Sequence, residues 1–146
     1  MNDAHHYRKL VHMFDVAPIN QQLIKGAVLQ VSQERAQLQL KMRNDFYHAA
    51  MSLHGAIYFK LLDDAAYFAA ASAEQTYFLF TKSYKIHFRR PVSGGELKAF
   101  GQLVDKSGNE WVARSEIVNE DGKTVASGEG LFVKSKLLLE AQFGCS

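Results

Sequence analysis

Two adjacent carboxylates lie in the middle of the longest apolar run of the chain. The run extends from His54 to Ser72 and reads HGAIYFKLLDDAAYFAAAS. A carboxylate in an apolar setting must be paired, hydrogen-bonded or shifted towards its neutral form, because burial penalises its charge. Asp63 and Asp64 are therefore the residues whose type and position indicate acid–base chemistry.

Helical spacing would give the two acids different neighbours. Lys60 and Asp64 are four residues apart, so an ion pair on one face of a helix is expected. The other side of that helix would hold Asp63 together with Phe59, Ala66, Tyr67 and Ala70. A carboxylate in such an apolar cleft has a raised pKa, which suits a general base or a nucleophile. The alternative, in which both acids cap or pair with surface groups, stays open at this point.

The run that carries the acids is predicted to be a helix, because Ala and Leu are strong helix formers and the run is longer than the strands of this chain. It is apolar on nearly every face, which is typical of a core helix. The lead-in DFYHAAMSL contains His48 and also Ser52, a residue that would cap the helix.

The segments around this helix have the patterns of one short helix and six strands. Residues 3–15 show helical spacing, and Pro18 ends that helix. Two strands are expected between 24 and 42, joined around 32–35, where apolar and polar residues alternate. Four more strands follow at 77–88, 96–104, 111–119 and 124–133. The separators PVSGG, DKSGN and NEDGK are turn compositions, so an antiparallel meander is predicted.

These elements predict an α+β fold in which an antiparallel sheet of about six strands wraps around the long helix and covers it all round. The length of 146 residues predicts a single domain over 1–146. Residues 1–20 would form an N-terminal helical extension, and 135–146 a C-terminal tail.

Composition excludes several classes of partner and site. A net charge of +2 gives no bulk electrostatic argument for nucleic acid. The single cysteine, Cys145, excludes a disulfide within the chain and a Cys-rich metal site, and it favours a cytoplasmic compartment. No uninterrupted apolar run is long enough for a membrane span, and the N-terminus lacks the features of a signal peptide. Histidines at 5, 6 and 12 have no acidic or cysteine partner at ligand spacing, so solvated side chains are expected there and no metal site.

The order of elements and two motifs resemble a known family. The order is similar to the hotdog fold, and HGAIYFKLLDDAAYFAAAS resembles the HGGxxxxLxD segment of the PaaI-like acyl-CoA thioesterases. Downstream, FRRPVSGGELKAFGQLVDKSGNEWVARSEIVNEDGKTVASGEGLF resembles that family's Arg-Pro, long hairpin and GKxVAxGxG pattern. The resemblance covers roughly residues 24–134. It implies hydrolysis of acyl-CoA thioesters, with coenzyme A as part of the substrate and no separate cofactor.

The family's site residues fall on named positions of this chain. An Asp nine residues after the motif histidine, His54, activates or orients water or attacks the thioester, and counting from His54 reaches Asp63. The N–H of the next residue, Gly55, matches the group that polarises the thioester carbonyl, a role that suits a helix N-terminus. Thr81 matches a Ser or Thr that helps hold the water.

Two positions depart from the family pattern. His48 stands where an Asn or similar amide is common, and Ala56 replaces the second Gly of the motif. His48 would donate a hydrogen bond as an amide does, act as an acid or base, or simply be satisfied by local backbone. It keeps a hotdog hydratase or dehydratase as an alternative. A noncatalytic acyl-CoA-binding or regulatory domain is a third, favoured if Asp63 is locked in a structural salt bridge.

The resemblance also implies cations for the coenzyme A phosphates and a second subunit. The candidate cations are Arg90, Arg89, Lys82, Lys106 and Lys134. Arg90 is the first choice, because Arg contacts phosphates in a bidentate manner. Family members form homodimers, in which the helix Asp of one subunit faces the His–Gly segment of the other, and homotetramers are common. Pairing of an exposed edge strand gives dimerisation a physical reason.

Overall fold

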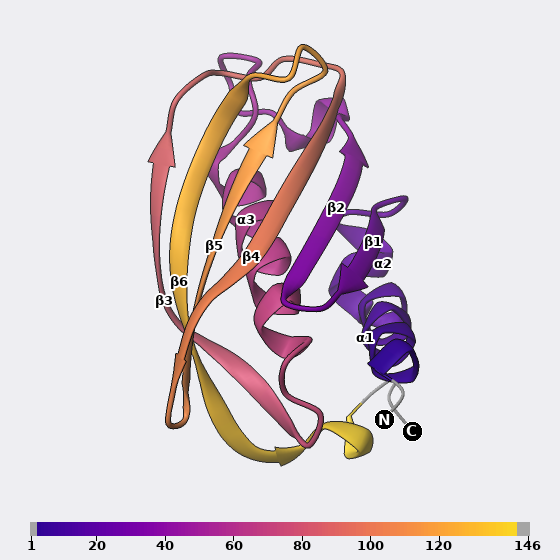
Figure 1. Cartoon of the computed structure of the whole chain (residues 1–146). Helices are drawn as coiled ribbons and strands as arrows, with labels where there is room; N and C mark the ends of the chain where they lie inside the picture. The colour runs from indigo at the N-terminus through magenta and orange to yellow at the C-terminus, as the bar shows by residue number, and fades with distance from the viewer. Residues whose placement is uncertain (1–2, 143–146) are drawn as a thin grey trace.

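The computed structural model of the chain describes residues 3–142, which form one six-stranded sheet and the helices packed on it (Figure 1). The helices are α1 (Asp3–Val16), α2 (Pro18–Gln22) and α3 (Gly55–Ala71), with short 3-10 turns η1 (Asn44–Phe46) and η2 (Leu139–Ala141). The strands are β1 (Val28–Ser32), β2 (Arg35–Lys41), β3 (Tyr77–Phe88), β4 (Glu96–Ser107), β5 (Glu110–Val118) and β6 (Thr124–Leu138).

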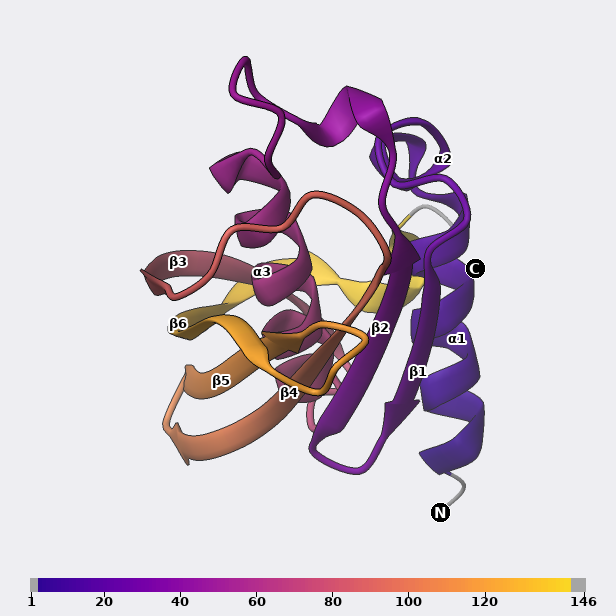
Figure 2. The ribbon, with the colours of Figure 1, turned by 90° about the horizontal axis from the view of Figure 1, so that it is seen from above.

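The strand order is β1-β2-β4-β5-β6-β3, and every pairing is antiparallel. The predicted meander is therefore wrong for its first strand, because β3 pairs with β6 and not with β4. The segment between β3 and β4 carries the chain from one edge of the sheet to its middle, where β4 pairs with β2. This crossover leaves β3 as a sheet edge beside α3, as the view from above shows (Figure 2).

Helix α3 lies along the concave face of the sheet, as its apolar sequence predicts (Figures 1 and 2). Its first turn is capped by His54, whose Nδ1 accepts a hydrogen bond from the Ala56 N–H at 2.9 Å. The expectation that Ser52 caps this helix is wrong, because the helix begins at Gly55 and the histidine ring takes that role.

The middle of α3 lies very close to the sheet. A Cβ at Gly101 on β4 would overlap the Ala65 carbonyl, so only glycine leaves room for the helix backbone there. Ala65 and Ala66, which lie at this contact, are fully buried. The helix is not covered all round, however. Phe59 is 39% exposed, so one flank of α3, near β3, is open.

Helix α1 packs beside β1 at the other edge of the sheet (Figure 2). Its buried residues include His6, whose Nε2 lies 2.8 Å from the Ala71 carbonyl at the end of α3. The expectation of solvated histidines is wrong for this residue, which is 5% exposed and donates a second hydrogen bond to a carbonyl that also accepts from the Glu74 N–H.

Strand β6 continues beyond the expected end at Val133 and reaches Leu138, so the first residues of the expected tail belong to the sheet. Cys145 lies outside the described residues. Within residues 3–142, no helix combines the length and apolarity that crossing a membrane requires.

Candidate active site

The N-terminus of α3 presents a free backbone donor. The N–H groups of Ala56 and Ile57 are bonded to the ring and the carbonyl of His54. The N–H of Gly55 has no acceptor among residues 3–142. An unpaired N–H at the positive end of a 17-residue helix is suited to a carbonyl oxygen on which negative charge develops.

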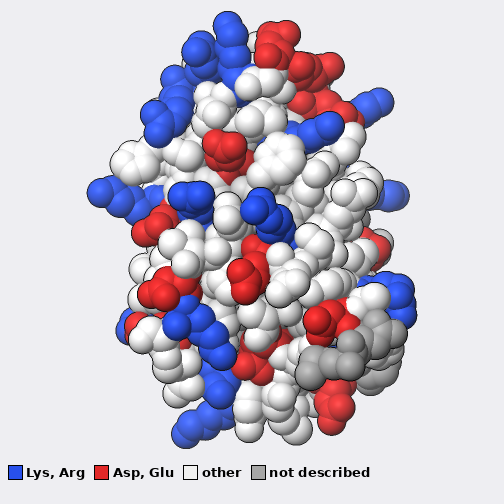
Figure 3. Space-filling model, in the orientation of Figure 1, with Lys and Arg blue, Asp and Glu red and all other residues white. Residues whose placement is uncertain are grey.

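A cavity of about 440 Å³ opens at this donor. Its lining brings together four of the residues predicted from the sequence: Gly55, His48, Arg89 and Arg90. Lys and Arg side chains gather near this end of the molecule, over the end of β3 (Figure 3). The cavity therefore combines a hydrogen-bond donor for a carbonyl with cations that would attract an anionic ligand.

The two arginines follow β3 on a segment that is tied to its neighbours. The N–H groups of Arg89 and Arg90 both donate to the Val125 carbonyl, at 2.9 and 3.1 Å. The Tyr58 hydroxyl of α3 donates to the Arg90 carbonyl at 2.8 Å. These bonds hold the cations beside the start of α3.

His48 is exposed and lies in the turn before α3. Its Nδ1 accepts a hydrogen bond from the Ala50 N–H at 3.1 Å. Because Nδ1 is the acceptor, the neutral ring carries its proton on Nε2. His48 therefore has a ring N–H to donate to a carbonyl in the cavity, as an amide at this position would.

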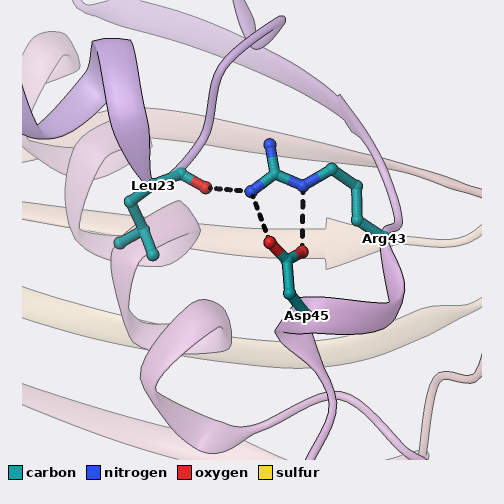
Figure 4. Close-up of polar contacts among 3 residues, drawn as sticks. All are labelled: Leu23, Arg43 and Asp45. Atoms are coloured by element: carbon teal, nitrogen blue, oxygen red, sulfur yellow. Dashed lines mark hydrogen bonds and ion pairs between the residues drawn. The ribbon is translucent and has the colours of Figure 1, made fainter.

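Arg43 holds the beginning of the same segment (Figure 4). Its guanidinium donates to both carboxylate oxygens of Asp45, at 3.0 and 3.3 Å, and to the Leu23 carbonyl at 3.0 Å. It also lies 4.4 Å from the centroid of the buried Phe46 ring. The Arg43 guanidinium thus connects the end of α2 to η1, which ends two residues before His48.

Asp63 is half-buried on the open flank of α3, where Thr81 of β3 donates a hydrogen bond to Oδ1 at 2.9 Å. Burial raises the pKa of Asp63, while the Thr81 bond and the charge of Lys60 oppose part of that rise. A positioned carboxylate with a raised pKa is what a general base near neutral pH requires.

Asp64 has a different role. Its Oδ2 lies 2.8 Å from Lys60 Nζ, which confirms the predicted ion pair. Burial nevertheless raises the pKa of Asp64 to about 6. This acid is enclosed with its partner, so it is less suited than Asp63 to act on a ligand.

Two hydroxyl groups near Asp63 were not predicted as site residues. The Tyr84 hydroxyl contacts the Ser115 hydroxyl, and burial is the main reason that the pKa of Tyr84 is raised to about 12. The Ser115 hydroxyl donates to the Leu62 carbonyl at 2.7 Å. The alternation Trp111, Ala113, Ser115, Ile117 carried a signal, because it places one hydroxyl on the dry face of a strand, where it needs a partner.

Some predicted site residues do not come together. Gly55 and Asp63 are eight residues apart on one helix, which separates them by about 12 Å along its axis. Lys82 lies at an irregularity of β3 next to Thr81, near Asp63. Lys106 and Lys134 lie at the opposite end of the sheet from Gly55, over the rings of Trp111 and Tyr77. No group of three or more His, Cys, Asp or Glu in residues 3–142 is arranged to hold a metal ion.

The fold is shared with solved structures of low sequence identity. PaaI of Escherichia coli, from the phenylacetic acid degradation operon, is 24% identical, with a TM-score of 0.81 over 93% of this chain and 96% of that one. AziG of S. sahachiroi is 21% identical, with a TM-score of 0.76 over 84% and 99%. A variant of the phenylacetic acid degradation protein PaaI from Thermus thermophilus is 22% identical, with a TM-score of 0.70 over 79% and 97%. These likenesses show the hotdog fold that the sequence predicted.

A search of curated protein sequences gave no match. The family model of the Thioesterase superfamily matches residues 51–126, which is more than half of the chain. The matched segment contains Gly55, Asp63, Thr81 and both arginines of the cavity. With its hotdog fold, the chain belongs to the thioesterase superfamily.

Proposed function

We propose that the protein hydrolyses acyl-CoA thioesters and that Asp63 assists the attack of water. The observation that supports this most directly is the state of the Asp63 carboxylate. It is half-buried, its pKa is raised, and a hydroxyl of the neighbouring strand orients it. A structural acid would be expected in an ion pair, but Lys60 is paired with Asp64.

The proposed reaction begins when Asp63 accepts a proton from water, whose oxygen attacks the thioester carbonyl carbon. The carbonyl oxygen becomes an oxyanion, which accepts a hydrogen bond from the Gly55 N–H and is stabilised by the helix terminus. The tetrahedral intermediate then collapses, and the carbon–sulfur bond breaks. The departing thiolate takes the proton held by Asp63, which leaves a free acid and the thiol of coenzyme A.

His48 fits this reaction as a second donor to the oxyanion. Its Nδ1 is occupied as an acceptor, so the proton on Nε2 is available for the carbonyl oxygen. A hydratase or dehydratase would use a histidine as an acid or base on the carbon chain. For hydrolysis His48 needs only to donate its Nε2–H, which its hydrogen-bonded tautomer supplies.

The phosphates of coenzyme A are assigned to Arg90 and Arg89. Both residues also line a neighbouring cavity of about 590 Å³, together with Lys123, Thr124, Ser127 and one acid, Glu116. The two cavities share the arginines, so a ligand that starts at the Gly55 N–H would extend past the cations onto the start of β6. Arg89 Nη2 lies 3.3 Å from the Ser127 hydroxyl and is exposed to a ligand there.

A second copy of the chain is proposed to complete the site. A carbonyl bound at Gly55 is about 12 Å from Asp63 of the same helix, too far for a water molecule to bridge. In the dimers implied by the resemblance, Asp63 of one copy faces Gly55 of the other. The apolar side chains of Phe59 and Phe80, 39% and 49% exposed, would then be covered.

Release of free thiol from a panel of acyl-CoA substrates tests the proposal. The wild type should release thiol, and Asp63→Asn should reduce kcat by on the order of a hundredfold or more. Asp64→Asn is the matched control and should stay within a few-fold of the wild type. Binding of acyl-CoA by a wild type that releases no thiol would overturn the proposal in favour of a noncatalytic domain. An inactive Asp64→Asn beside an active Asp63→Asn would show that the wrong acid has been assigned.

A further inference from the structure

We propose that Tyr84 and Ser115 are positioning residues: together they form a hydroxyl clamp on the Leu62 carbonyl that fixes where the adjacent Asp63 stands. The expected effect of the clamp on kcat rests on the function proposed above, whereas the geometry of the clamp does not. Neither residue reaches the cavity at Gly55.

The clamp is a chain of two hydrogen bonds that ends on the helix backbone. The Ser115 hydroxyl donates to the Leu62 carbonyl at 2.7 Å, so its proton is committed to that bond. The Tyr84 hydroxyl contacts Ser115 Oγ and therefore donates to it, and it also lies 3.4 Å from the Leu62 carbonyl. Hydroxyls linked in this way polarise one another in a buried setting, which strengthens both bonds.

The sheet is shaped to let the Tyr84 ring reach Ser115. Tyr84 is on β3, Ser115 is on β5, and β6 lies between them. On β6, a Cβ at Gly128 or at Gly130 would overlap the Tyr84 ring. Two glycines at alternate positions of one strand thus leave a furrow in which the ring crosses β6.

An irregularity in β3 directs both Thr81 and Tyr84 towards α3. The register with β6 shifts between Thr81 and Ser83. Side chains of a regular strand alternate between faces, so positions 81 and 84 would point to opposite sides. With the shift, Thr81 bonds to Asp63 while Tyr84 bonds towards Leu62. Strand β3 therefore contacts α3 at two consecutive residues, Leu62 and Asp63.

The contacts of the Tyr84 ring extend this hold along the open flank of the helix. The ring packs edge-on against Phe59, with centroids 5.8 Å apart. The Asp63 charge also contributes to the raised pKa of Tyr84, which is consistent with their proximity. A shift of α3 at Leu62 would move Asp63 relative to Thr81, and small displacements of a reacting group lower catalytic rates steeply.

The test uses Tyr84→Phe and Ser115→Ala, which remove hydroxyls and keep the ring and the strand. Ser135→Ala is the matched control, because the Ser135 hydroxyl also bonds a backbone carbonyl, that of Phe78, away from Leu62. Ser115→Thr keeps the hydroxyl and should therefore give the wild-type values in the measurements below. Three quantities are measured in each variant: the rate of amide hydrogen exchange at Ala66, the pKa of the Asp63 carboxyl by carbon-13 NMR, and kcat and KM.

The clamp predicts the same changes in both hydroxyl deletions. Exchange at Ala66, whose N–H bonds the Leu62 carbonyl in the helical pattern, should accelerate by on the order of tenfold. The pKa of Asp63 should fall towards its ordinary value, because water gains access while Lys60, Asp64 and Thr81 remain its other neighbours. The value of kcat should fall by on the order of tenfold with KM nearly unchanged.

The outcomes separate the clamp from the proposed function. A wild type that releases no thiol would overturn the function, and the exchange rates and the Asp63 pKa would still decide the clamp. Unchanged amide exchange at Ala66 and an unchanged pKa of Asp63 in Tyr84→Phe and Ser115→Ala would overturn the clamp. Equal effects in Ser135→Ala would also overturn it, because they would indicate general loosening of the fold.

Discussion

Asp63 and Asp64 are adjacent in the sequence, but their environments assign them different chemistry. Burial raises the pKa of both carboxyls. A hydroxyl orients Asp63 on the open flank, while Asp64 is enclosed with Lys60. The proposed site therefore depends on the face of the helix that each acid occupies more than on acidity alone.

Replacement of Thr81 by valine should shift the pH dependence of the reaction. Asp63 must be ionised to accept a proton, so kcat/KM falls as the pH drops through its raised pKa. The Thr81 bond favours the ionised form and lowers that pKa, so Thr81→Val should raise it and move the acid limb to higher pH. The value of kcat should fall by roughly fivefold, as expected for the loss of one hydrogen bond. An acid limb that does not move would contradict the role of Thr81.

Asp64 should make the fold less stable as pH rises. The ordinary pKa of an aspartate side chain is 3.8, and the pKa of Asp64 in the folded chain is about 6, so folding favours the protonated form. That contribution is fully present below about pH 4 and is lost as pH rises through about 6, a difference of about 3 kcal/mol. Asp64→Asn does not titrate, so its free energy of unfolding, measured with urea, should improve relative to the wild type between about pH 4 and 7. A difference independent of pH would show that Asp64 keeps an ordinary pKa.

At the scale of elements, the contact between α3 and β4 depends on the absence of a Cβ at Gly101. Gly101→Ala would force a Cβ against the Ala65 carbonyl, which is backbone and cannot rotate away. The free energy of unfolding should fall by about 1–3 kcal/mol. Gly55→Ala is the control, because a Cβ there would meet only the Phe88 ring at 3.6 Å, an ordinary contact. Equal losses in the two variants, measured by urea denaturation, would contradict the close approach.

The elements themselves were largely predictable, because each has a local pattern. The apolar run gave α3 to within a residue at each end, and a high content of Phe, Tyr and Thr gave the strand 77–88 with its observed bounds. The partner of β3 was not predictable in this way. Nothing local to β3 distinguishes β4 from β6 as its neighbour, so the meander followed from the short turns alone and was wrong.

The sequence predicted the candidate site residues, but not the residues that position them. Helical spacing separated Asp63 from Asp64, and the structure confirms the pair of Asp64 with Lys60. The choice of His54 over Ser52 as cap depends on where the helix begins, which sequence patterns locate poorly. Tyr84 and Ser115 were missed because their hydrogen bonds join strands that are not neighbours in the sequence.

At the scale of the whole molecule, the proposed site lies between two copies, and mixing inactive variants tests this. Gly55→Pro removes the N–H at the first helical position, where proline is tolerated, and His54 already has an extended backbone. Gly55→Pro and Asp63→Asn should each be inactive alone. When the two are mixed in equal amounts and allowed to exchange subunits, activity should return to about a quarter of the wild type, since half of the dimers regain one of two sites.

Gly55→Ala, which keeps the N–H, is the control for Gly55→Pro and should retain more activity. Subunit exchange is verified with two differently tagged chains. If mixed dimers form but no activity returns, the Gly55 and Asp63 that act together belong to the same chain, and the two-copy site is wrong.

The placement of β3 has a consequence for how the site comes into being. Thr81 is opposite Phe132 of β6, so the strand that orients Asp63 has no neighbour in the sheet until the chain has been made for about fifty more residues. Contacts between such distant segments form slowly, because a long loop must close first. In a growing chain, α3 can be complete while Asp63 still lacks its hydroxyl partner. The proposed site would then be completed last, when β6 pairs with β3.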